Sequence, residues 1–155
     1  MAPPYLFRPM DDADAREISA WRYGPPSDFY DATADPDDLA ELLDPERRRG
    51  VYFSVLDGEG GLVGFFQFEK GDGTVDVGLG LRPDLAGKGL GTGFVLSGLE
   101  FARERFSPER FALSVATFNG RAIRVYERAG FRRGENFVHG TNGGEHEFVR
   151  MERGA

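Results

Sequence analysis

The segment with the clearest chemical potential is rich in glycine and runs from Leu79 to Gly93. It reads Leu-Gly-Leu-Arg-Pro-Asp-Leu-Ala-Gly-Lys-Gly-Leu-Gly-Thr-Gly and joins a strand-like stretch to an apolar stripe at helical spacing. A helix N-terminus carries unpaired N–H groups and a partial positive charge, and glycines leave the backbone uncovered. The pattern therefore predicts a cradle for a phosphate or a diphosphate.

Three phosphate-binding patterns compete for this turn. The ATPase loop requires a glycine where Arg82 stands and Ser or Thr where Gly89 stands, so it fails twice. The dinucleotide fingerprint Gly-x-Gly-x-x-Gly fails because a start at either Gly87 or Gly89 meets a side chain at the third glycine position. The acetyl-CoA loop, Gln/Arg-x-x-Gly-x-Gly/Ala, is matched in its glycines by residues 86–91, with Ala86 in place of the usual Gln or Arg.

A second motif lies one predicted helix and one predicted strand further on, at residues 119–131. It reads Asn-Gly-Arg-Ala-Ile-Arg-Val-Tyr-Glu-Arg-Ala-Gly-Phe and matches Asn-x-x-Ala-x-x-x-Tyr-x-x-x-Gly-Phe. In this order and at this spacing, the two motifs resemble the GNAT superfamily of acyl-CoA-dependent N-acetyltransferases over residues 75–131. The departure at Ala86 removes one side chain from the pattern and leaves the backbone donors in place.

The resemblance implies that acetyl-CoA is the acyl-donor cosubstrate. Its diphosphate would meet the backbone of residues 87–92, and its pantetheine amides would pair with a strand whose parallel neighbour splays away. Asn119 would cap a helix and lie near the pantetheine arm. Lys88 would touch a phosphate as a point charge, although a solvated loop lysine is an equal alternative. The predicted cofactor-binding residues are Leu79, Leu81, Gly87, Lys88, Gly89, Leu90, Gly91, Thr92 and Asn119.

The resemblance also implies that Tyr126 donates a proton to the departing CoA thiolate. A phenol has an ordinary pKa near 10 and a thiol one near 8.5, so the phenol stays protonated until the proton is needed. The alternative is a core tyrosine, since Tyr126 lies at helical spacing from Ala122 and Ala129.

A general base is needed as well, because a lysine-like amine has a pKa near 10.4. The chain has no Cys, so direct attack by the amine in a ternary complex is simpler than an acetyl-cysteine intermediate. Asp76 is the predicted base, and it shares a strand face with Gly78 and Gly80, which would leave room for a substrate. Glu69 and Glu100 are the other carboxylates nearby in sequence.

The acceptor is predicted to bind residues 21–30, where four aromatic residues occur within ten positions. Such a loop carries more aromatic surface than a connection requires. Tyrosine rings and a carboxylate suit a primary amine of a small molecule or protein through cation–π and charge contacts. The predicted substrate-binding residues are Trp21, Tyr23, Asp28 and Tyr30, with a core position as the alternative for Trp21.

The elements that position these residues follow from apolar periodicity, turn residues and caps. Strands are predicted at residues 5–10, 51–56, 62–68, 75–81, 111–116, 131–138 and 145–151. Helices are predicted at residues 11–21, 90–106 and 119–129. A further short helix, carrying Leu39, Leu42 and Leu43, is predicted to follow Asp35-Pro36 and to be ended by Asp44-Pro45. This order predicts an α/β, GNAT-like fold: a mixed, mostly antiparallel sheet of about seven strands, flanked by about four helices, with a central β-α-β acetyl-CoA-binding unit.

Composition limits the function. Of 155 residues, 19 are Lys or Arg and 26 are Asp or Glu, and the net charge of −7 disfavours nucleic acid as a partner. The absence of Cys excludes a thiolate zinc site and a cysteine nucleophile, and no metal site is predicted. The length predicts one N-acetyltransferase domain over residues 1–155.

Location and partners are predicted from the same composition. No stretch is apolar and long enough to cross a bilayer, and the first residues lack the basic start of a signal peptide, so a cytoplasmic protein without membrane contact is expected. A homodimer is a possible assembly. The predicted function is acetyl transfer from acetyl-CoA to a primary amine. The alternative is a non-catalytic acyl-CoA-binding sensor or regulatory module, which would keep the turn and lack the proton-transfer groups.

Overall fold

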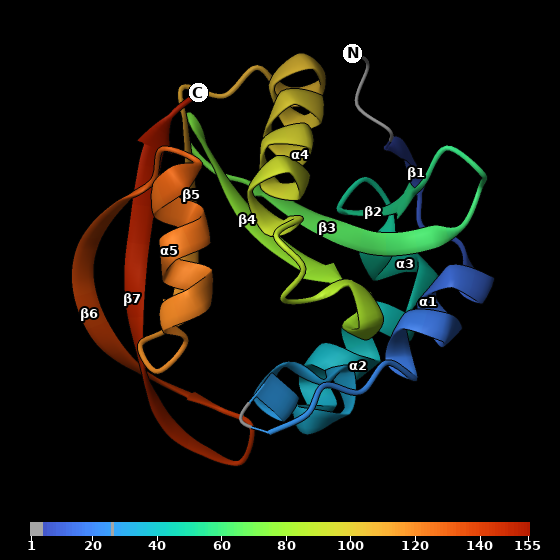
Figure 1. Cartoon of the computed structure of the whole chain (residues 1–155), viewed down its shortest axis with the longest axis horizontal. Helices are drawn as coiled ribbons and strands as arrows, with labels where there is room; N and C mark the ends of the chain where they lie inside the picture. Colours follow the sequence, from blue (N-terminus) through green and yellow to red (C-terminus); the bar gives the residue numbers. More distant parts are fainter. Residues whose placement is uncertain (1–4, 26) are drawn as a thin grey trace. The chain divides into compact units, whose positions relative to one another are not determined.

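Seven strands form one mixed sheet in the structure, a computed structural model that describes residues 5–25 and 27–155. The strand order is β1-β2-β3-β4-β5-β7-β6, and Figure 1 labels the elements along the chain. The strands are β1 (Leu6–Pro9), β2 (Tyr52–Leu56), β3 (Leu62–Lys70), β4 (Thr74–Leu81), β5 (Arg110–Ala116), β6 (Arg132–Thr141) and β7 (Gly144–Gly154). Strands β1 and β2, β2 and β3, and β5 and β7 pair antiparallel, whereas β4 and β5 pair in parallel, so the predicted mixed, mostly antiparallel sheet is confirmed.

The helices also follow the predicted order. They are α1 (Asp12–Ser19), α2 (Pro36–Leu43), α3 (Pro45–Arg48), α4 (Gly91–Phe106) and α5 (Gly120–Arg128), with short 3₁₀ turns η1 (Ser27–Tyr30), η2 (Ala32–Ala34) and η3 (Pro83–Leu85). Residues 1–4 and Pro26 lie outside the described residues. The expectation that no signal peptide is present concerns the first of these, and Pro26 belongs to the predicted acceptor segment. Within the described ranges, none of the helices has the length and apolarity needed to cross a lipid bilayer.

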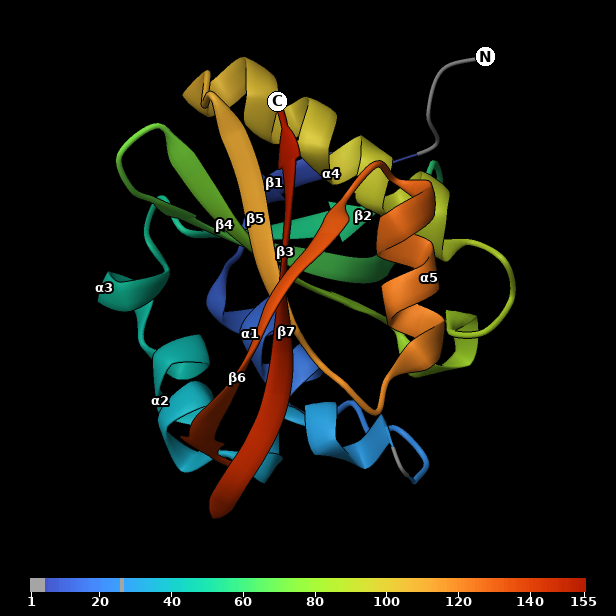
Figure 2. The same cartoon turned by 90° about the vertical axis from the view of Figure 1, so that its left-hand side faces the viewer.

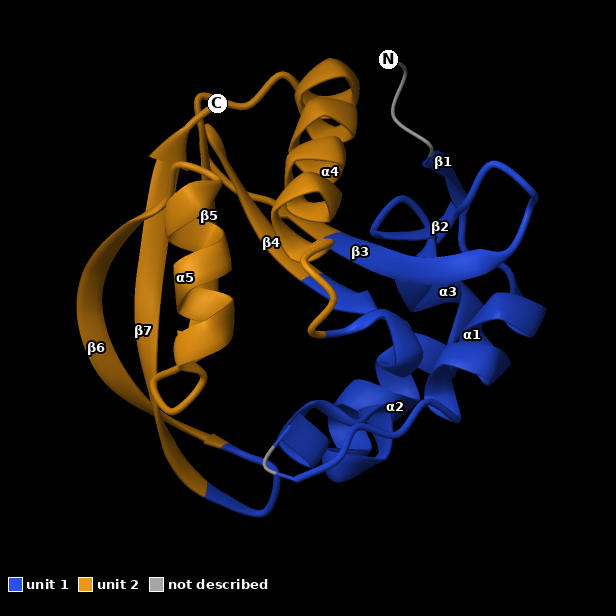
Figure 3. Ribbon diagram, viewed as in Figure 1, with its two compact units in different colours: residues 1–67, 79–86, 141–144 blue, residues 68–78, 87–140, 145–155 orange. Residues whose placement is uncertain are grey.

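The chain forms two compact units, which Figure 3 colours separately. Unit 1 comprises residues 1–67, 79–86 and 141–144, and unit 2 comprises residues 68–78, 87–140 and 145–155. The chain passes from one unit to the other within β3 and within β4. The single domain expected for the whole chain stays a prediction.

Unit 1 has an apolar cluster to which α1, α2, β2 and β3 contribute side chains. The members of this cluster are Met10, Ala15, Ile18, Trp21, Leu42, Tyr52 and Leu62. Asp11 caps α1 by accepting from the backbone N–H of Asp14 at 2.7 Å. Helix α1 ends at Ser19, so Trp21 follows the helix and still reaches the cluster.

The predicted end of the second helix is confirmed, since α2 ends at Leu43 and Asp44 is its C-cap. Asp44-Pro45 also begins the next helix, α3, which was not predicted. The Asp44 carboxylate accepts from the N–H of Glu46 at 2.9 Å, and Pro45 occupies the first helical turn, where its missing N–H costs nothing. The same residue types that stop a helix at one side start a helix at the other.

Unit 2 contains the helices α4 and α5 and the strands β5, β6 and β7. Helix α4 buries one stripe, made of Phe94, Val95, Gly98, Leu99 and Ala102, and it contacts α5. Strand β6 is the last in the strand order, and Figure 2 shows it crossing β7. The side chains of β6 are exposed from residue 132 to residue 140, so this strand adds surface and not core.

Candidate active site

Strands β4 and β5 pair in parallel only at their beginnings. The register joins Thr74 to Arg110, Val75 to Phe111 and Asp76 to Ala112, and within the described ranges no later pair joins these strands, although both continue. Later main-chain groups on this edge of β4 therefore have no partner in β5. The pairing of a pantetheine arm with this edge stays a prediction.

The glycine turn in unit 2 combines an unusual backbone with open space. Gly87 and Gly89 have φ angles of +76° and +77°, which L side chains rarely adopt. A Cβ atom at Gly89 would meet no heavy atom within 4 Å, so a side chain there would project into open space beside the turn. Gly91 is needed for a different reason, because its Cβ would lie 3.2 Å from the methyl groups of Val125 on α5.

The N-terminus of α4 offers donors to an anion. Its N-cap is Leu90, whose side chain makes no capping hydrogen bond, and within the described residues the amides of Gly91, Thr92 and Gly93 are given no acceptor. Gly93, like Gly89, has no heavy atom within 4 Å of a Cβ position. Free amides, a helix dipole and bare backbone together suit a diphosphate.

Arg121 joins this cradle, and the sequence analysis did not single it out. Its Nη1 atom lies 2.7 Å from the position that a Cβ of Gly87 would take, so the guanidinium stands directly against the turn. Arg121 is exposed and belongs to the first turn of α5. A guanidinium here would bind phosphate oxygens through a fork of N–H groups. Its place in the second motif, two residues after Asn119, was the available signal.

Asn119 and Tyr126 are both placed by α5. The Asn119 side-chain oxygen accepts from the N–H of Ala122 at 3.2 Å, which gives the predicted cap. Tyr126 is half-buried, and its ring meets Phe131 edge-on at a centroid distance of 6.1 Å. The proton-donor role of Tyr126 and the cofactor contact of Asn119 stay predictions.

In unit 1, the end of β4 is held from two sides. The N–H of Arg82 donates to the carbonyl of Val63 at 2.8 Å, and the Arg82 guanidinium donates to the carbonyl of Leu62 at 3.0 Å. Because successive peptide groups of a strand point to opposite edges, the N–H and C=O of Leu79 and Leu81 face away from β3. This orientation leaves them on the edge at which a pantetheine arm was predicted to pair.

Tyr23 forms a hydrogen bond with one of these groups, the Leu81 carbonyl. Its hydroxyl donates to the carbonyl of Leu81 at 2.5 Å, and its own backbone N–H donates to Asp31 Oδ1 at 2.8 Å. Burial, helped by the charge of Asp31, raises the pKa of Tyr23 to about 12, so the phenol stays protonated and able to donate throughout the neutral range.

Asp76, the predicted base, lies in unit 2 and is ion-paired. Its Oδ1 atom accepts from Arg150 Nη2 at 2.6 Å, and the two side chains are 47% and 34% exposed. This pair joins residues 74 positions apart, so it could not be predicted from the sequence.

The room expected beside Gly80 is absent. A Cβ atom at Gly80 would lie 2.5 Å from Cε1 of Phe65, so the Phe65 ring fills that space. The expectation of a substrate opening at Gly80 is therefore wrong. The glycine is there so that the strand can pack against this aromatic ring.

The predicted acceptor residues divide into packed and exposed groups within unit 1. Trp21 is only 8% exposed and packs in the apolar cluster, so little of its side chain is accessible to a substrate. Its predicted contact with the acceptor stays a prediction. Asp28 is exposed, and its carboxylate has no hydrogen-bond or ion-pair partner among the described residues. Tyr30 is 39% exposed, and its ring meets Phe29 edge-on at 5.2 Å.

A carboxylate that the sequence analysis treated only as a helix start fastens the acceptor segment. Asp35 Oδ2 accepts from the Thr141 hydroxyl at 2.6 Å and from the N–H of Asn142 at 3.0 Å, while Oδ1 accepts from the first amides of α2. The amide of Asn142 donates to the carbonyl of Phe29 at 2.6 Å. These bonds, led by that from Thr141, hold the pKa of Asp35 at about 2.

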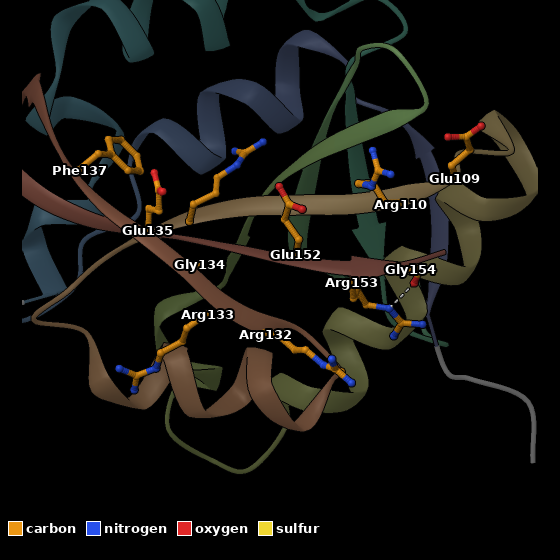
Figure 4. A pocket seen from close by; sticks show the side chains of 12 residues that line it. Glu109, Arg110, Arg132, Arg133, Gly134, Glu135, Phe137, Glu152, Arg153 and Gly154 are labelled. Carbon is orange, nitrogen blue, oxygen red and sulfur yellow. Dashed lines mark hydrogen bonds between the residues drawn. The ribbon is translucent and has the colours of Figure 1, made fainter.

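A hollow of about 980 Å³ lies on unit 2 and contains none of the predicted site residues (Figure 4). Its charged lining consists of Arg110, Arg132, Arg133, Arg150, Arg153, Glu109, Glu135 and Glu152. Arg150 is also the partner of Asp76, so the wall of the hollow adjoins the predicted base. No group of three or more His, Cys, Asp or Glu side chains within residues 5–25 and 27–155 is placed to hold a metal ion.

The family described as acetyltransferase (GNAT) domain matches residues 5–132. An acetyltransferase of the GNAT family from Bacillus anthracis has a TM-score of 0.77 at 19% identity and covers 99% of this chain and 96% of its own. Spermidine N-acetyltransferase from Vibrio cholerae, in complex with CoA and spermine, has a TM-score of 0.75 at 19% identity, with 97% and 95% covered.

A dodecameric structure of spermidine N-acetyltransferase from Vibrio cholerae has a TM-score of 0.72 at 20% identity and covers 97% of this chain and 94% of its own. No curated protein matches the chain. At these identities the solved structures show a shared fold, while the family match covers most of the chain.

Proposed function

Because the chain belongs to the GNAT acetyltransferase family, we propose that it transfers the acetyl group of acetyl-CoA to a primary amine by direct attack in a ternary complex. Family membership makes the protein an acyltransferase with acetyl-CoA as its acyl donor. The observation that carries the finer proposal is the bare turn before α4, where two glycines at positive φ lead into a helix N-terminus without a side-chain cap.

The residues of this turn would hold the diphosphate of acetyl-CoA. The amides of Gly91, Thr92 and Gly93 would donate to its oxygens, and Arg121 would add a charged donor from α5. The exposed side chain of Lys88 would contribute charge without a fixed geometry. The remaining predicted cofactor contacts, at Leu79, Leu81, Gly87, Gly89, Leu90 and Asn119, stay part of the proposal.

Proton transfer is assigned to two side chains. Bound acetyl-CoA supplies an activated acetyl thioester. The Tyr126 hydroxyl would give its proton to the departing sulfur, a role that a phenol suits because its ordinary pKa exceeds that of a thiol. Asp76 would attract the amine and accept its proton. Its carboxylate is ion-paired with Arg150 in the structure. Turnover should increase as pH rises, because the free amine becomes more abundant.

A cationic acceptor is supported by charge. The chain has a net charge of −7, and the exposed Asp28 carboxylate stands near Tyr30 in sequence with no partner among the described residues. Two of the structural neighbours are named as spermidine N-acetyltransferases, which makes polyamines the first acceptors to test. We also propose a single catalytic domain, a cytoplasmic location and self-association, since one neighbour is dodecameric.

The test is release of the free CoA thiol from acetyl-CoA with a panel of spermidine, an aminoglycoside, an amino acid and a peptide. We expect release that depends on the amine, and acetylated product by mass spectrometry. Thermal stabilisation by acetyl-CoA without thiol release for any amine would instead support the non-catalytic sensor. If the protein neither binds acetyl-CoA nor releases the thiol, the proposed function is refuted.

A further inference from the structure

Tyr23 is fixed at both of its ends, which is more than a residue that only lines a pocket requires. Its backbone N–H donates to Asp31, and its hydroxyl donates to the Leu81 carbonyl at 2.5 Å. The hydroxyl thus reaches 58 positions along the chain, to the last residue of β4. The side chain is half-buried, so this bond is partly shielded from water.

The Leu81–Arg82 peptide group is bound on both of its edges. Tyr23 donates to its oxygen, while its N–H donates to the Val63 carbonyl at 2.8 Å. Donation to a peptide oxygen polarises the same peptide and strengthens the bond that its N–H makes. The plane of this peptide, and with it the direction of the Leu81 carbonyl, is therefore set by Tyr23 and Val63 together.

The acceptor segment does not need Tyr23 to stay in place. Asp35 binds Thr141 and Asn142, and Asn142 binds the carbonyl of Phe29, so the segment is fastened independently further along. The particular contribution of the Tyr23 hydroxyl is then to the end of β4. A carbonyl oxygen has two lone pairs, so Leu81 can accept from a second donor beside Tyr23.

We propose that Tyr23 is a positioning residue, which orients the Leu81 carbonyl toward a pantetheine amide and so ties the acceptor segment to cofactor binding. This inference rests on the proposed function. It differs from the sequence prediction, in which the Tyr23 side chain contacts the amine itself. Loss of the hydroxyl should weaken only those ligands that carry the pantetheine arm.

The test compares two ligands on two variants by isothermal titration calorimetry. CoA carries the pantetheine arm, and adenosine 3′-phosphate 5′-diphosphate is the same nucleotide and diphosphate without it. Tyr23→Phe should weaken CoA about three- to tenfold, the effect of one lost hydrogen bond, and leave the affinity for the nucleotide within about twofold. Tyr5→Phe removes a hydroxyl elsewhere in unit 1 and should leave both affinities within about twofold.

The outcomes separate the inference from the function. If the wild type binds neither ligand, the proposed function fails. If the wild type binds both but Tyr23→Phe weakens both equally, or neither, Tyr23 has no positioning role. Circular dichroism checks the fold of each variant. Should Tyr23→Phe not fold, Asp31→Ala removes the acceptor of the Tyr23 N–H while keeping the phenol, and equal effects on the two ligands would again overturn the inference.

Discussion

Gly80→Ala tests the packing that shapes the end of β4, where we propose that the pantetheine arm binds. A Cβ atom at this position would lie 2.5 Å from Cε1 and 3.1 Å from Cζ of Phe65. Carbon atoms prefer about 3.5–4.0 Å, so ring or strand must move by about 1 Å. The ring cannot simply swing away, because Phe65 packs against the apolar cluster of unit 1.

Overpacking of this kind costs about 1–3 kcal/mol. For a chain of this length, each kcal/mol lowers the melting temperature by about 2–4 °C, so we expect a drop of about 2–12 °C by calorimetry. CoA affinity should fall as well, because Gly80 lies between Leu79 and Leu81 and any shift of the strand moves their amides. Gly58→Ala is the control, since its Cβ position meets no heavy atom within 4 Å.

A shorter side chain at position 65 should relieve the overlap. The double variant Gly80→Ala/Phe65→Leu should be more stable than the sum of the single effects predicts, with a coupling of about 0.5–3 kcal/mol. A melting temperature of Gly80→Ala within about 1 °C of the wild type, or strictly additive effects in the double variant, would refute the reasoning that Phe65 dictates glycine at this position.

Three further predictions concern the turn, the proton donor and the acceptor segment. Gly89→Glu should weaken acetyl-CoA binding about tenfold or more in calorimetry, because the residue requires positive φ and the new carboxylate would repel the diphosphate; undiminished affinity would place the phosphates elsewhere. Tyr126→Phe should lower kcat about 10²- to 10⁴-fold while the Kd for acetyl-CoA stays within about twofold, and an unchanged kcat would remove Tyr126 from the mechanism. The pKa of Asp35 is lowered from 3.8 to about 2, so its stabilising effect is present above pH 4 and lost as pH falls toward 2; the difference in urea midpoint between wild type and Asp35→Asn should shrink over that range, and a constant difference would contradict the assignment.

The sequence predicted the elements around the turn well, because their signals are local. Helix α4 begins where glycines give way to an apolar stripe, and α5 begins at Asn119, whose side chain caps it as expected. The parallel pairing of β4 with β5 follows from the intervening helix, since parallel strands need a crossover. The same local signals placed the end of α2 at Asp44-Pro45 correctly, but they did not predict α3, which the same aspartate caps.

Long-range contacts of the site could not be predicted in this way. The bonds of Asp76 with Arg150, of Tyr23 with Leu81 and of Asp35 with Thr141 join residues 74, 58 and 106 positions apart. Periodicity assigns a side chain to a face of its own element, but not to the neighbour that will meet that face. Asp76, the predicted general base, is therefore found in an ion pair with Arg150 that periodicity could not reveal.

Glycine illustrates the same limit, because one residue type meets three separate requirements within twelve positions. Gly80 avoids the ring of Phe65, Gly91 avoids the methyl groups of Val125, and Gly87 and Gly89 adopt positive φ. Only at Gly89 would a side chain meet open space, so substitution there acts on the ligand with little effect on packing. Gly89→Glu should therefore lower mainly the affinity for acetyl-CoA, whereas Gly80→Ala should lower the melting temperature. This difference separates the binding role of glycine in this segment from its structural role.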